Sequence, residues 1–237
     1  MFYNQNMATL YIIGTPIGNL GDISIRAAEA FKNVELVACE DTRRTLKLLN
    51  HLGVRVTLLS CRSQNEEIAA KRVIAALDQG FNVAYASDAG TPALSDPGAV
   101  LVRLAVAAGH NAVPIPGPSA FATLLSVSGG WDKTVIFEGF LSPKAGRRKN
   151  RLRELMAQEA AIVLYESPYR IIKLLQDIAE IDNNRYICIG REMTKVHEEY
   201  VRGAATEVLA NFAKKNEQIG EFSVYIAGNN SNLCVNY

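Results

Sequence analysis

Cysteine and histidine are scarce in this sequence. Its 237 residues include four cysteines and three histidines. The cysteines form no C-x-x-C pair and stand far apart, at Cys39, Cys61, Cys188 and Cys234. This pattern is typical of reduced thiols in a cytoplasmic protein and disfavours a disulfide framework. The histidines are equally scattered, so we expect no metal site.

Long apolar runs are also absent, and neither sign of charge predominates. No run approaches the roughly 18 residues that a membrane-spanning helix needs, and no basic region typical of a signal peptide precedes the first apolar segment. We therefore expect no membrane association. Hydrophobic residues make up 49% of the chain and charged residues 21%, which favours folded cores over disorder. A formal net charge of +1 does not exclude a nucleic-acid-binding protein, because a basic face can exist on a nearly neutral chain.

Apolar strand candidates alternate with helical segments through the first half of the chain. The expected strands are 10–14, 35–39, 54–59, 82–86 and 112–115. The expected helices between them are 24–32, 42–52, 63–80 and 98–108. Strands separated by helices indicate βαβ units and a parallel or mostly parallel sheet.

Two of these helices begin at recognisable capping sequences. Ser63-Gln64-Asn65-Glu66 has the spacing of a capping box, in which the first and fourth side chains satisfy each other's backbone N–H groups. Asp96-Pro97 would place an N-cap before a proline, whose missing N–H costs nothing at the first helical position. We therefore expect Asp96 to be a structural helix cap.

The second half repeats the alternation. Strands are expected at 135–140, 161–165, 186–189, 198–202 and 221–227. Helices are expected at 119–127, 169–181 and 206–214, and a further helix follows the basic segment 144–151 and ends at about residue 158. The turn Pro116-Gly117-Pro118 is the best candidate for a boundary. The fold class is therefore α/β, with one domain at 1–117 and another at 118–237.

Four loops follow strands of the first half, at 15–22, 40–44, 87–98 and 116–120. In α/β sheets, ligands bind beyond the carboxyl ends of the strands, so these loops are the predicted binding site. Their glycines do not follow G-x-G-x-x-G, and the P-loop lysine is missing, which disfavours a dinucleotide or nucleoside triphosphate. Ordinary turn chemistry stays open as an alternative. Asp88 is harder to assign to a turn than Asp96, because Gly90 beside it allows close backbone approach by a ligand.

Basic residues cluster at 144–153, and Arg43 and Arg44 form a second, smaller group. Such runs are often only solvated. Cations at a helix start oppose the helix dipole, however, so phosphate binding is the alternative. Glu166, Arg191 and Glu192 follow buried strands of the second half, where they are either strand terminators or functional residues.

Seven segments together resemble one known family. In order they are "TPIGNLGDIS", "CEDTRRT", "SDAGTPALSDPG", "PGPSA", "EGFL", "YESPYR" and "REMTK". They are similar to the tetrapyrrole methylase superfamily, and within it to the ribosomal RNA small subunit methyltransferase I family, over residues 9–228. The resemblance implies two α/β domains of the tetrapyrrole-methylase type, with S-adenosylmethionine in the inter-domain cleft of a homodimer. It also implies 2′-O-methylation of a cytidine in the decoding centre of 16S rRNA, within the small ribosomal subunit (cytidine 1402 in the family).

The resemblance also assigns residues to roles. The implied cofactor contacts are Thr15, Pro16, Asp88, Ala89, Gly90, Ser119, Ala120 and Tyr165. From the charge of the basic segments rather than from the resemblance, we expect RNA phosphates to be bound by Arg43, Arg44, Lys144, Arg147, Arg148, Lys149 and Arg151. Methyl transfer to a ribose hydroxyl requires its proton to be removed, and developing negative charge on its oxygen can be stabilised. The candidates for this are Asp88, Glu166, Arg191 and Glu192, which the sequence does not rank.

Two other functions stay open at this point. A methylase of a tetrapyrrole, such as a cobalamin or sirohaem precursor, would not need the basic cluster at 144–153. A non-catalytic ribosome-associated module would bind the small subunit without transferring a methyl group.

Overall fold

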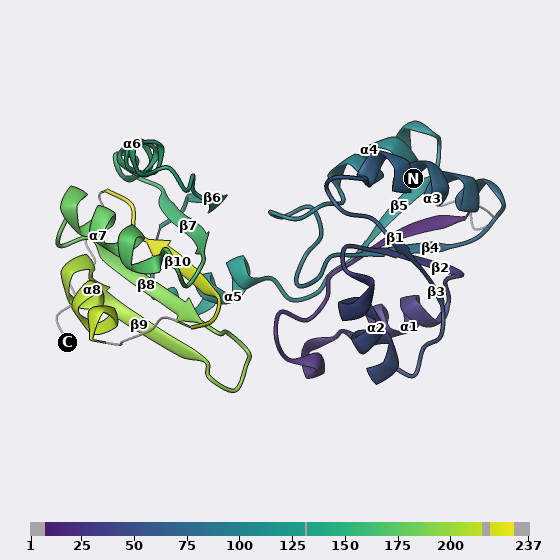
Figure 1. The fold of residues 1–237 in the computed structure, drawn as a ribbon, viewed down its shortest axis with the longest axis horizontal. Helices are drawn as coiled ribbons and strands as arrows, with labels where there is room; N and C mark the ends of the chain where they lie inside the picture. The colour runs from purple at the N-terminus through teal and green to yellow at the C-terminus, as the bar shows by residue number, and fades with distance from the viewer. Residues whose placement is uncertain (1–7, 131, 215–218, 230–237) are drawn as a thin grey trace. The chain divides into compact units, whose positions relative to one another are not determined.

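Residues 8–130, 132–214 and 219–229 are described by a computed structural model of the chain. Its contacts divide the chain into two units, Met1–Ser119 and Ala120–Tyr237 (Figure 1). The division falls just after the turn Pro116-Gly117-Pro118.

The first unit contains a five-stranded sheet in which every strand pair is parallel. Its order is β3-β2-β4-β1-β5. The strands are β1 (Thr9–Ile13), β2 (Leu36–Cys39), β3 (Thr57–Ser60), β4 (Val83–Ala86) and β5 (Asn111–Ile115). The helices are the short 3-10 helix η1 (Leu20–Asp22), then α1 (Ile25–Lys32), α2 (Thr42–His51), α3 (Glu66–Asp78) and α4 (Ala99–Ala107). The parallel sheet predicted from the alternation is therefore confirmed, and only η1 was not predicted.

Helices cover both faces of this sheet, which explains why its strands are apolar throughout rather than alternating. Val37 and Cys39 of β2 pack with α1 and α2, whereas Ala38 between them packs with α3 and α4. Successive residues of β4 divide between the two cores in the same way. Figure 1 shows α1 and α2 on one side of the sheet and α3 and α4 on the other.

Both predicted capping sequences are wrong. Helix α3 begins after Asn65 and not after Ser63, and the Asn65 side chain accepts the Arg62 N–H at 2.7 Å instead of capping the helix. Helix α4 begins after Gly98, so Asp96 is not its N-cap. Gly98 has a φ of 127°, and a Cβ at this position would lie 2.7 Å from the Tyr85 ring. The turn into α4 therefore requires glycine.

The carboxylate that satisfies the first turn of α4 comes from α3. Glu66 is buried, and its Oε1 accepts the N–H groups of Gly98 at 2.9 Å and Leu101 at 3.0 Å. These are N–H groups that have no partner within their own helix. A negative charge also interacts favourably with the positive end of the helix dipole. Glu66 is thus the cap of α4, supplied from a distance of 32 residues in sequence.

The second unit contains a mixed sheet with the order β6-β7-β10-β8-β9. Strands β6 and β7 are parallel, and the remaining pairs are antiparallel. The strands are β6 (Val135–Phe140), β7 (Ala161–Glu166), β8 (Tyr186–Arg191), β9 (Glu199–Ala204) and β10 (Phe222–Ile226). The helices are α5 (Ala120–Ser128), α6 (Ala145–Met156), α7 (Ile171–Ile181) and α8 (Ala205–Ala213).

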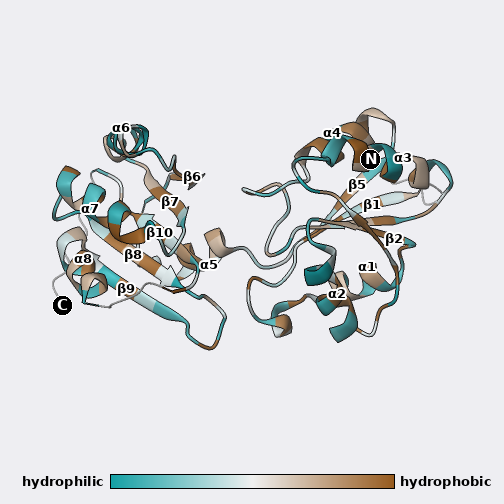
Figure 2. Ribbon diagram, in the orientation of Figure 1, coloured by the Kyte–Doolittle hydropathy of each residue, from teal (hydrophilic) through white to brown (hydrophobic). Residues whose placement is uncertain are grey.

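One large core holds this second unit together. Leu155 of α6, Leu174 of α7 and Phe212 of α8 are all buried against the same face of the sheet. Helix α5 contacts β8 and β10, and Tyr186 of β8 donates to the Ser128 carbonyl of α5 at 2.7 Å. Figure 2 shows the middle of β8 as hydrophobic, whereas α6 is largely hydrophilic. Within the described ranges, no helix combines the length and apolarity needed to cross a membrane.

Candidate active site

The carboxyl edge of the first sheet contains a topological switch point. Strands β1 and β4 are neighbours, yet the chain leaves β1 for α1 on one face and leaves β4 for α4 on the other. The same holds for the neighbours β2 and β4, because α2 lies on the face of α1. Where adjacent strands send their loops to opposite faces, a crevice opens that α/β proteins use for ligands.

Hydrogen bonds join three of the four predicted loops at this edge. Thr15 and Gly90 form an antiparallel bridge, with N···O distances of 2.9 and 3.0 Å. The Thr15 hydroxyl also donates to the Ser87 carbonyl at 3.4 Å. Thr91 donates to the carbonyl of Pro118 at 3.4 Å. The convergence inferred from strand order is therefore present in the structure.

Two glycines allow the backbones of these loops to touch. A Cβ on Gly117 would lie 2.4 Å from the Gly14 carbonyl oxygen, and a Cβ on Gly14 would lie 2.7 Å from the Gly117 nitrogen. Gly90 has a φ of 78°, and a Cβ there would lie 3.3 Å from the Ile17 side chain. Main-chain N–H and C=O groups, rather than side chains, thus form much of this edge.

Asp88 connects the remaining loop to the other three. Its Oδ1 accepts the backbone N–H of Asp41 at 2.8 Å, and its Oδ2 lies 3.4 Å from the Arg44 guanidinium. Asp41 in turn is the N-cap of α2 and accepts the N–H of Arg43. The Asp88 carboxylate therefore fixes the start of α2 against the end of β4.

Asp88 also lines two cavities of the first unit. One, of about 350 Å³, is lined by Glu40, Asp41, Arg43, Arg62, Ser63, Gln64 and Asp88. The other, of about 260 Å³, is lined by Thr15, Pro16, Leu20, Arg44, Thr45, Lys47, Leu48, Ser87 and Asp88. Both lie at the carboxyl edge, on either side of the end of β4.

Carboxylates share this edge with cations: Glu40, Asp41 and Asp88 line its two cavities together with Arg43, Arg44, Lys47 and Arg62. Burial raises the pKa of Asp96 to about 6; the charge of Glu40 adds to this effect, and a hydrogen bond from Ser87 opposes it. Burial and the charge of Asp88 also raise the pKa of Glu40. Asp96 is therefore not a helix cap but part of an acidic group beside Asp88, and ionised carboxylates so placed favour a cation nearby.

Replacing Asp96 with asparagine should stabilise the protein only at neutral and alkaline pH. Because the pKa of Asp96 is raised from 3.8, the folded state binds this proton more tightly than the unfolded chain does. The free energy of unfolding therefore falls as the pH rises from about 4 to about 6, and the variant avoids this loss. Thermal unfolding at pH 4 and pH 8 would measure it. An equal gain in melting temperature at both pH values would contradict the assignment.

The predicted cofactor residues of the second unit gather at the start of α5. Ala120 is the first residue of this helix, and the next residue, Phe121, donates its N–H to the Tyr165 hydroxyl at 3.1 Å. The Tyr165 ring packs edge to face on Phe137 and Phe140, with centroid distances of 5.0 and 5.8 Å. In the first unit, Ser119 directly precedes Ala120, and the carbonyl of Ala89 accepts the Ser87 hydroxyl at 3.4 Å.

Glu166, a candidate from sequence, is buried at the end of β7. Its Oε1 accepts the Ser167 N–H at 2.8 Å and pairs with Arg170 at 2.6 Å. Its Oε2 is buried and has no hydrogen-bond partner among the described residues. The Arg170 guanidinium also donates to the Leu141 carbonyl at 3.4 Å. Glu166 and Arg170 thereby tie the loop after β7 to the loop after β6.

Arg191 and Glu192 follow β8 and are held by other residues. Arg191 donates to the Ile219 carbonyl at 2.7 Å and pairs with Glu199 at 3.1 Å. Burial raises the pKa of Glu192, but hydrogen bonds from Lys195 and the Glu221 N–H outweigh this and leave the pKa below its ordinary value. A carboxylate with a lowered pKa is a weaker base, which makes Glu192 less suited to accept a proton.

The structure divides the predicted RNA-binding residues into paired and unpaired side chains. Arg148 is buried and pairs with Asp177 at 2.6 Å. The other pairs are Lys149 with Glu180, Arg151 with Glu138, Arg43 with Asp41 and Arg44 with Asp88. Lys144 and Arg147 are exposed, and neither side chain has an ion-pair partner in the described part of the chain. The geometry thus leaves Arg148 no surface on which to meet RNA.

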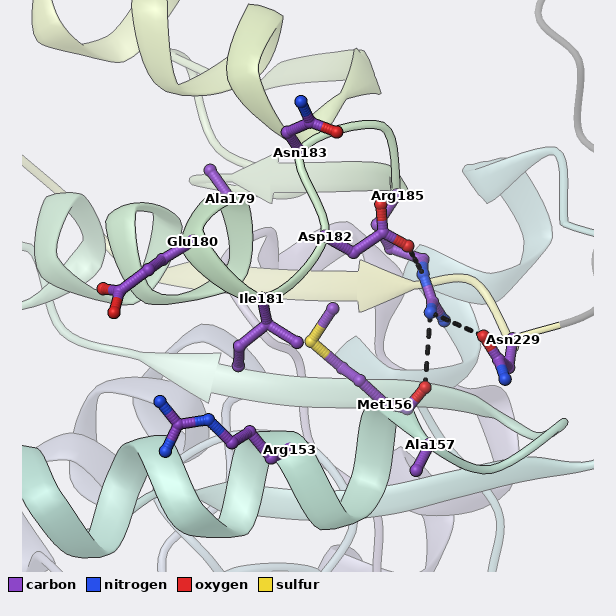
Figure 3. Close-up of a pocket in the computed structure, with 10 residues that line it drawn as sticks. All are labelled: Arg153, Met156, Ala157, Ala179, Glu180, Ile181, Asp182, Asn183, Arg185 and Asn229. Atoms are coloured by element: carbon purple, nitrogen blue, oxygen red, sulfur yellow. Dashed lines mark hydrogen bonds and ion pairs between the residues drawn. The ribbon is translucent and has the colours of Figure 1, made fainter.

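A further cavity, of about 560 Å³, lies in the second unit (Figure 3). Arg185 beside it donates to Asp182 at 3.0 Å, to the Met156 carbonyl at 3.3 Å and to Asn229 at 3.1 Å. Arg185 directly precedes β8, so this cavity lies at the opposite edge of the sheet from Arg191. It brings together none of the residues predicted from sequence, and Arg185 is a clamp between α6, α7 and the end of β10.

A model of the tetrapyrrole (corrin/porphyrin) methylases matches residues 9–209 of the chain. The chain belongs to the tetrapyrrole methylase family. Within this family, proteins named ribosomal RNA small subunit methyltransferase I are similar over nearly the whole chain. The relative from Borrelia garinii is 43% identical over 94% of this chain and 100% of its own length. The relative from Thermotoga maritima is 43% identical over 94% and 99%, and that from Escherichia coli O157:H7 is 40% identical over 95% and 79%.

Two solved structures have the same fold at low sequence identity. A cobalt precorrin-4 methyltransferase matches with a TM-score of 0.67 and 15% identity, over 92% of this chain and 94% of its own. A diphthine synthase matches with a TM-score of 0.66 and 17% identity, over 93% and 90%. At these identities the comparison concerns the fold alone.

In this member of the tetrapyrrole methylase family, several residues at the carboxyl edge were not among the individual candidates selected from the sequence. Glu40 and Asp41 directly follow β2 and lie in the predicted loop 40–44, but neither side chain was selected individually. Lys47 lines the smaller cavity one turn after Arg44 on α2. No local signal pointed to Glu66, because its partners lie on another helix.

Proposed function

We propose that the chain is an S-adenosylmethionine-dependent methyltransferase whose substrate is the 16S rRNA of the small ribosomal subunit. The observation that carries the proposal is the 43% identity to a ribosomal RNA small subunit methyltransferase I over 94% of this chain and all of the relative. We further propose that the methyl group goes to the 2′-oxygen of a cytidine ribose, as the family resemblance implies.

The carboxyl edge of the first sheet suits this cofactor. S-adenosylmethionine supplies an electrophilic methyl group on a positively charged sulfonium. The close approach of Gly14 to Gly117 leaves no space there for side chains, so a ligand meets backbone N–H and C=O groups. Asp88, Asp96 and Glu40 place carboxylates at this edge, where an ionised carboxylate interacts favourably with a cation. The cavity of about 260 Å³ that Thr15 and Pro16 line is just below the usual range for small-ligand sites, about 300–1,000 Å³, and Asp88 also lines the second cavity, of about 350 Å³.

We assign the cofactor contacts as follows from the geometry and the resemblance. Thr15 and Pro16 border the smaller cavity, and Asp88 to Gly90 contribute backbone groups beside it. Asp88 positions these groups through its bond to the Asp41 N–H. Ser119 and Ala120, with Tyr165, complete the set as predictions that rest on the resemblance.

The catalytic requirements are modest, because positioning alone can supply much of the rate of a methyl transfer. The ribose hydroxyl must lose its proton as the bond forms, and a carboxylate can accept it. Among the candidates, Asp88 lies at the proposed cofactor edge, whereas Glu192 has a lowered pKa and Glu166 is buried. Arg191, held by Glu199 and Ile219, stays a candidate for stabilising negative charge on the oxygen.

RNA phosphates are assigned to the cations that the fold leaves available. These are Lys144, Arg147 and Arg44, of which only Arg44 faces a carboxylate, at 3.4 Å. Lys149 and Arg151 are exposed enough to exchange their carboxylate partners for phosphates. Arg148 is left out, because its pairing with Asp177 is buried. Such contacts set position on the RNA and carry no sequence information.

Methyl transfer to small subunits tests the function directly. Purified protein, labelled S-adenosylmethionine and subunits lacking the modification should give one methyl group per 16S rRNA, and mapping should locate it on a cytidine ribose. A porphyrinoid substrate serves as the second arm. Label in the porphyrinoid alone would overturn the RNA assignment, and absence of S-adenosylmethionine binding by calorimetry would overturn the methyltransferase. The homodimer stays a prediction, which sedimentation equilibrium would check.

A further inference from the structure

Two aromatic side chains project into solvent at the carboxyl edge of the second sheet. Tyr169 is 89% exposed and Phe140 is 57% exposed. Phe140 ends β6, and Tyr169 follows the end of the adjacent, parallel β7. Large aromatic side chains usually bury most of their surface, because each removes roughly 150–250 Å² from water. Two such side chains left exposed at one sheet edge therefore need an explanation.

A hydrogen bond, supported by a partly buried ion pair, connects the residues that follow the two aromatics. Arg170 donates to the carbonyl of Leu141 at 3.4 Å, and Glu166 holds Arg170 at 2.6 Å. Tyr169 directly precedes Arg170, and Phe140 directly precedes Leu141. The hydrogen bond thus links the side chain of the residue after Tyr169 to the backbone of the residue after Phe140. Phe140 is fixed further by edge-to-face packing on Tyr165.

Unpaired cations follow on the same loop. Lys144 and Arg147 lie three and six residues after Leu141, at the start of α6, and both are exposed. Cations at a helix N-terminus oppose the helix dipole, so they do not serve the helix. The carboxylates nearby are already neutralised, Glu138 by Arg151 and Glu166 by Arg170. This end of the unit therefore presents aromatic rings beside uncompensated positive charge.

We propose that Tyr169 and Phe140 are stacking platforms for unpaired RNA bases, and that Lys144 and Arg147 bind the adjoining phosphates. The inference rests on the proposed function and specifies the form of its substrate, which is a single-stranded segment. Bases within a duplex are stacked on one another and cannot reach such rings, whereas unstacked bases pack readily on exposed aromatics. Positive charge beside aromatic rings is the combination that recognises single-stranded nucleic acid.

The tyrosine ring can be tested separately from the charges. Stacking is worth about 1–3 kcal/mol per base, so Tyr169→Leu should weaken binding of a short oligocytidine by about 5- to 150-fold. Tyr169→Trp keeps an aromatic face and should bind within about twofold of the original protein. The matched control is Phe81→Leu, which alters an exposed aromatic just before β4, at the amino edge of the first sheet. Fluorescence anisotropy with a labelled oligonucleotide would measure all three.

The contribution of Lys144 and Arg147 should be measurable in the salt dependence of RNA binding. Each phosphate contact on a single strand contributes about 0.7 to the slope of log K against log salt. Lys144→Ala with Arg147→Ala should therefore flatten the slope by about 1.4, whereas Tyr169→Leu should leave it unchanged. Lys71→Ala with Arg72→Ala, at two exposed cations of α3, is the control.

The outcomes separate this inference from the proposed function. If the original protein methylates small subunits but Tyr169→Leu binds oligocytidine like the Phe81→Leu control, the stacking assignment is wrong and the function stands. Loss of binding to whole subunits with unchanged oligocytidine affinity would mean that this face docks on ribosomal protein, and would equally overturn it. Failure of the original protein to methylate any RNA concerns the function and not the binding measurement.

Discussion

Replacing Asp177 with alanine is expected to destabilise the protein by about 3–5 kcal/mol. Asp177 and Arg148 pair at 2.6 Å, and their side chains are only 6% and 5% exposed. Without Asp177, the Arg148 guanidinium would remain inside the second unit with no opposite charge beside it. Chemical denaturation followed by circular dichroism would measure the loss.

The control for this prediction lies one turn further along the same helix. Glu180 pairs with Lys149 at 2.6 Å, but both side chains are solvated. Glu180→Ala should leave the denaturation midpoint unchanged, because exposed ion pairs contribute little. Equal midpoints for the Asp177 and Glu180 variants would show that burial does not determine how much these ion pairs contribute to stability. The result also matters for RNA binding, since alanine substitution of Arg148 would lower affinity through unfolding alone.

Replacing Gly117 with alanine should lower the affinity for S-adenosylmethionine by about 5- to 150-fold. The new Cβ would lie 2.4 Å from the Gly14 carbonyl oxygen, so the two loops would have to separate. Forcing extra atoms into a packed site costs about 1–3 kcal/mol, and each 1.4 kcal/mol is tenfold in affinity. Isothermal titration calorimetry on the folded variant would measure the change.

Gly146→Ala provides the comparison for this second prediction. Gly146 lies in α6, and a Cβ there would have no neighbour within 4 Å. Alanine is the better helix former by about 1 kcal/mol, so this variant should gain stability and keep its cofactor affinity. Unchanged affinity in the Gly117 variant would show that the cofactor does not bind at this edge. Reduced affinity in both variants would point to a general effect of glycine replacement.

The elements of the fold could be predicted because their signals are local. An apolar run such as β8 and the helix that precedes it can be recognised from a few neighbouring residues. Their predicted boundaries lie within a few positions of those in the structure. The convergence of the four loops also followed from strand order alone. Asp88 could be selected for its place after β4, but its bond to the Asp41 N–H joins residues 47 apart in sequence.

The failures share one physical cause, which is a partner distant in sequence. Asp96 before Pro97 matches a helix cap, yet α4 takes its carboxylate from Glu66. The basic cluster looked uniform in sequence because nothing local distinguishes Arg148 from Arg147. The difference is Asp177, 29 residues further on, which only helix packing brings to Arg148.

The capping of α4 by Glu66 has a consequence for the order of folding. Synthesis proceeds from the N-terminus, so α3 leaves the ribosome before the amide groups of Gly98 and Leu101 emerge. Their acceptor is therefore already made when they appear, but it serves them only once α3 has docked on the sheet. Until then the first turn of α4 has unpaired N–H groups. We therefore expect the segment 87–98, between β4 and α4, to adopt its final turn only after α3 has docked on the sheet.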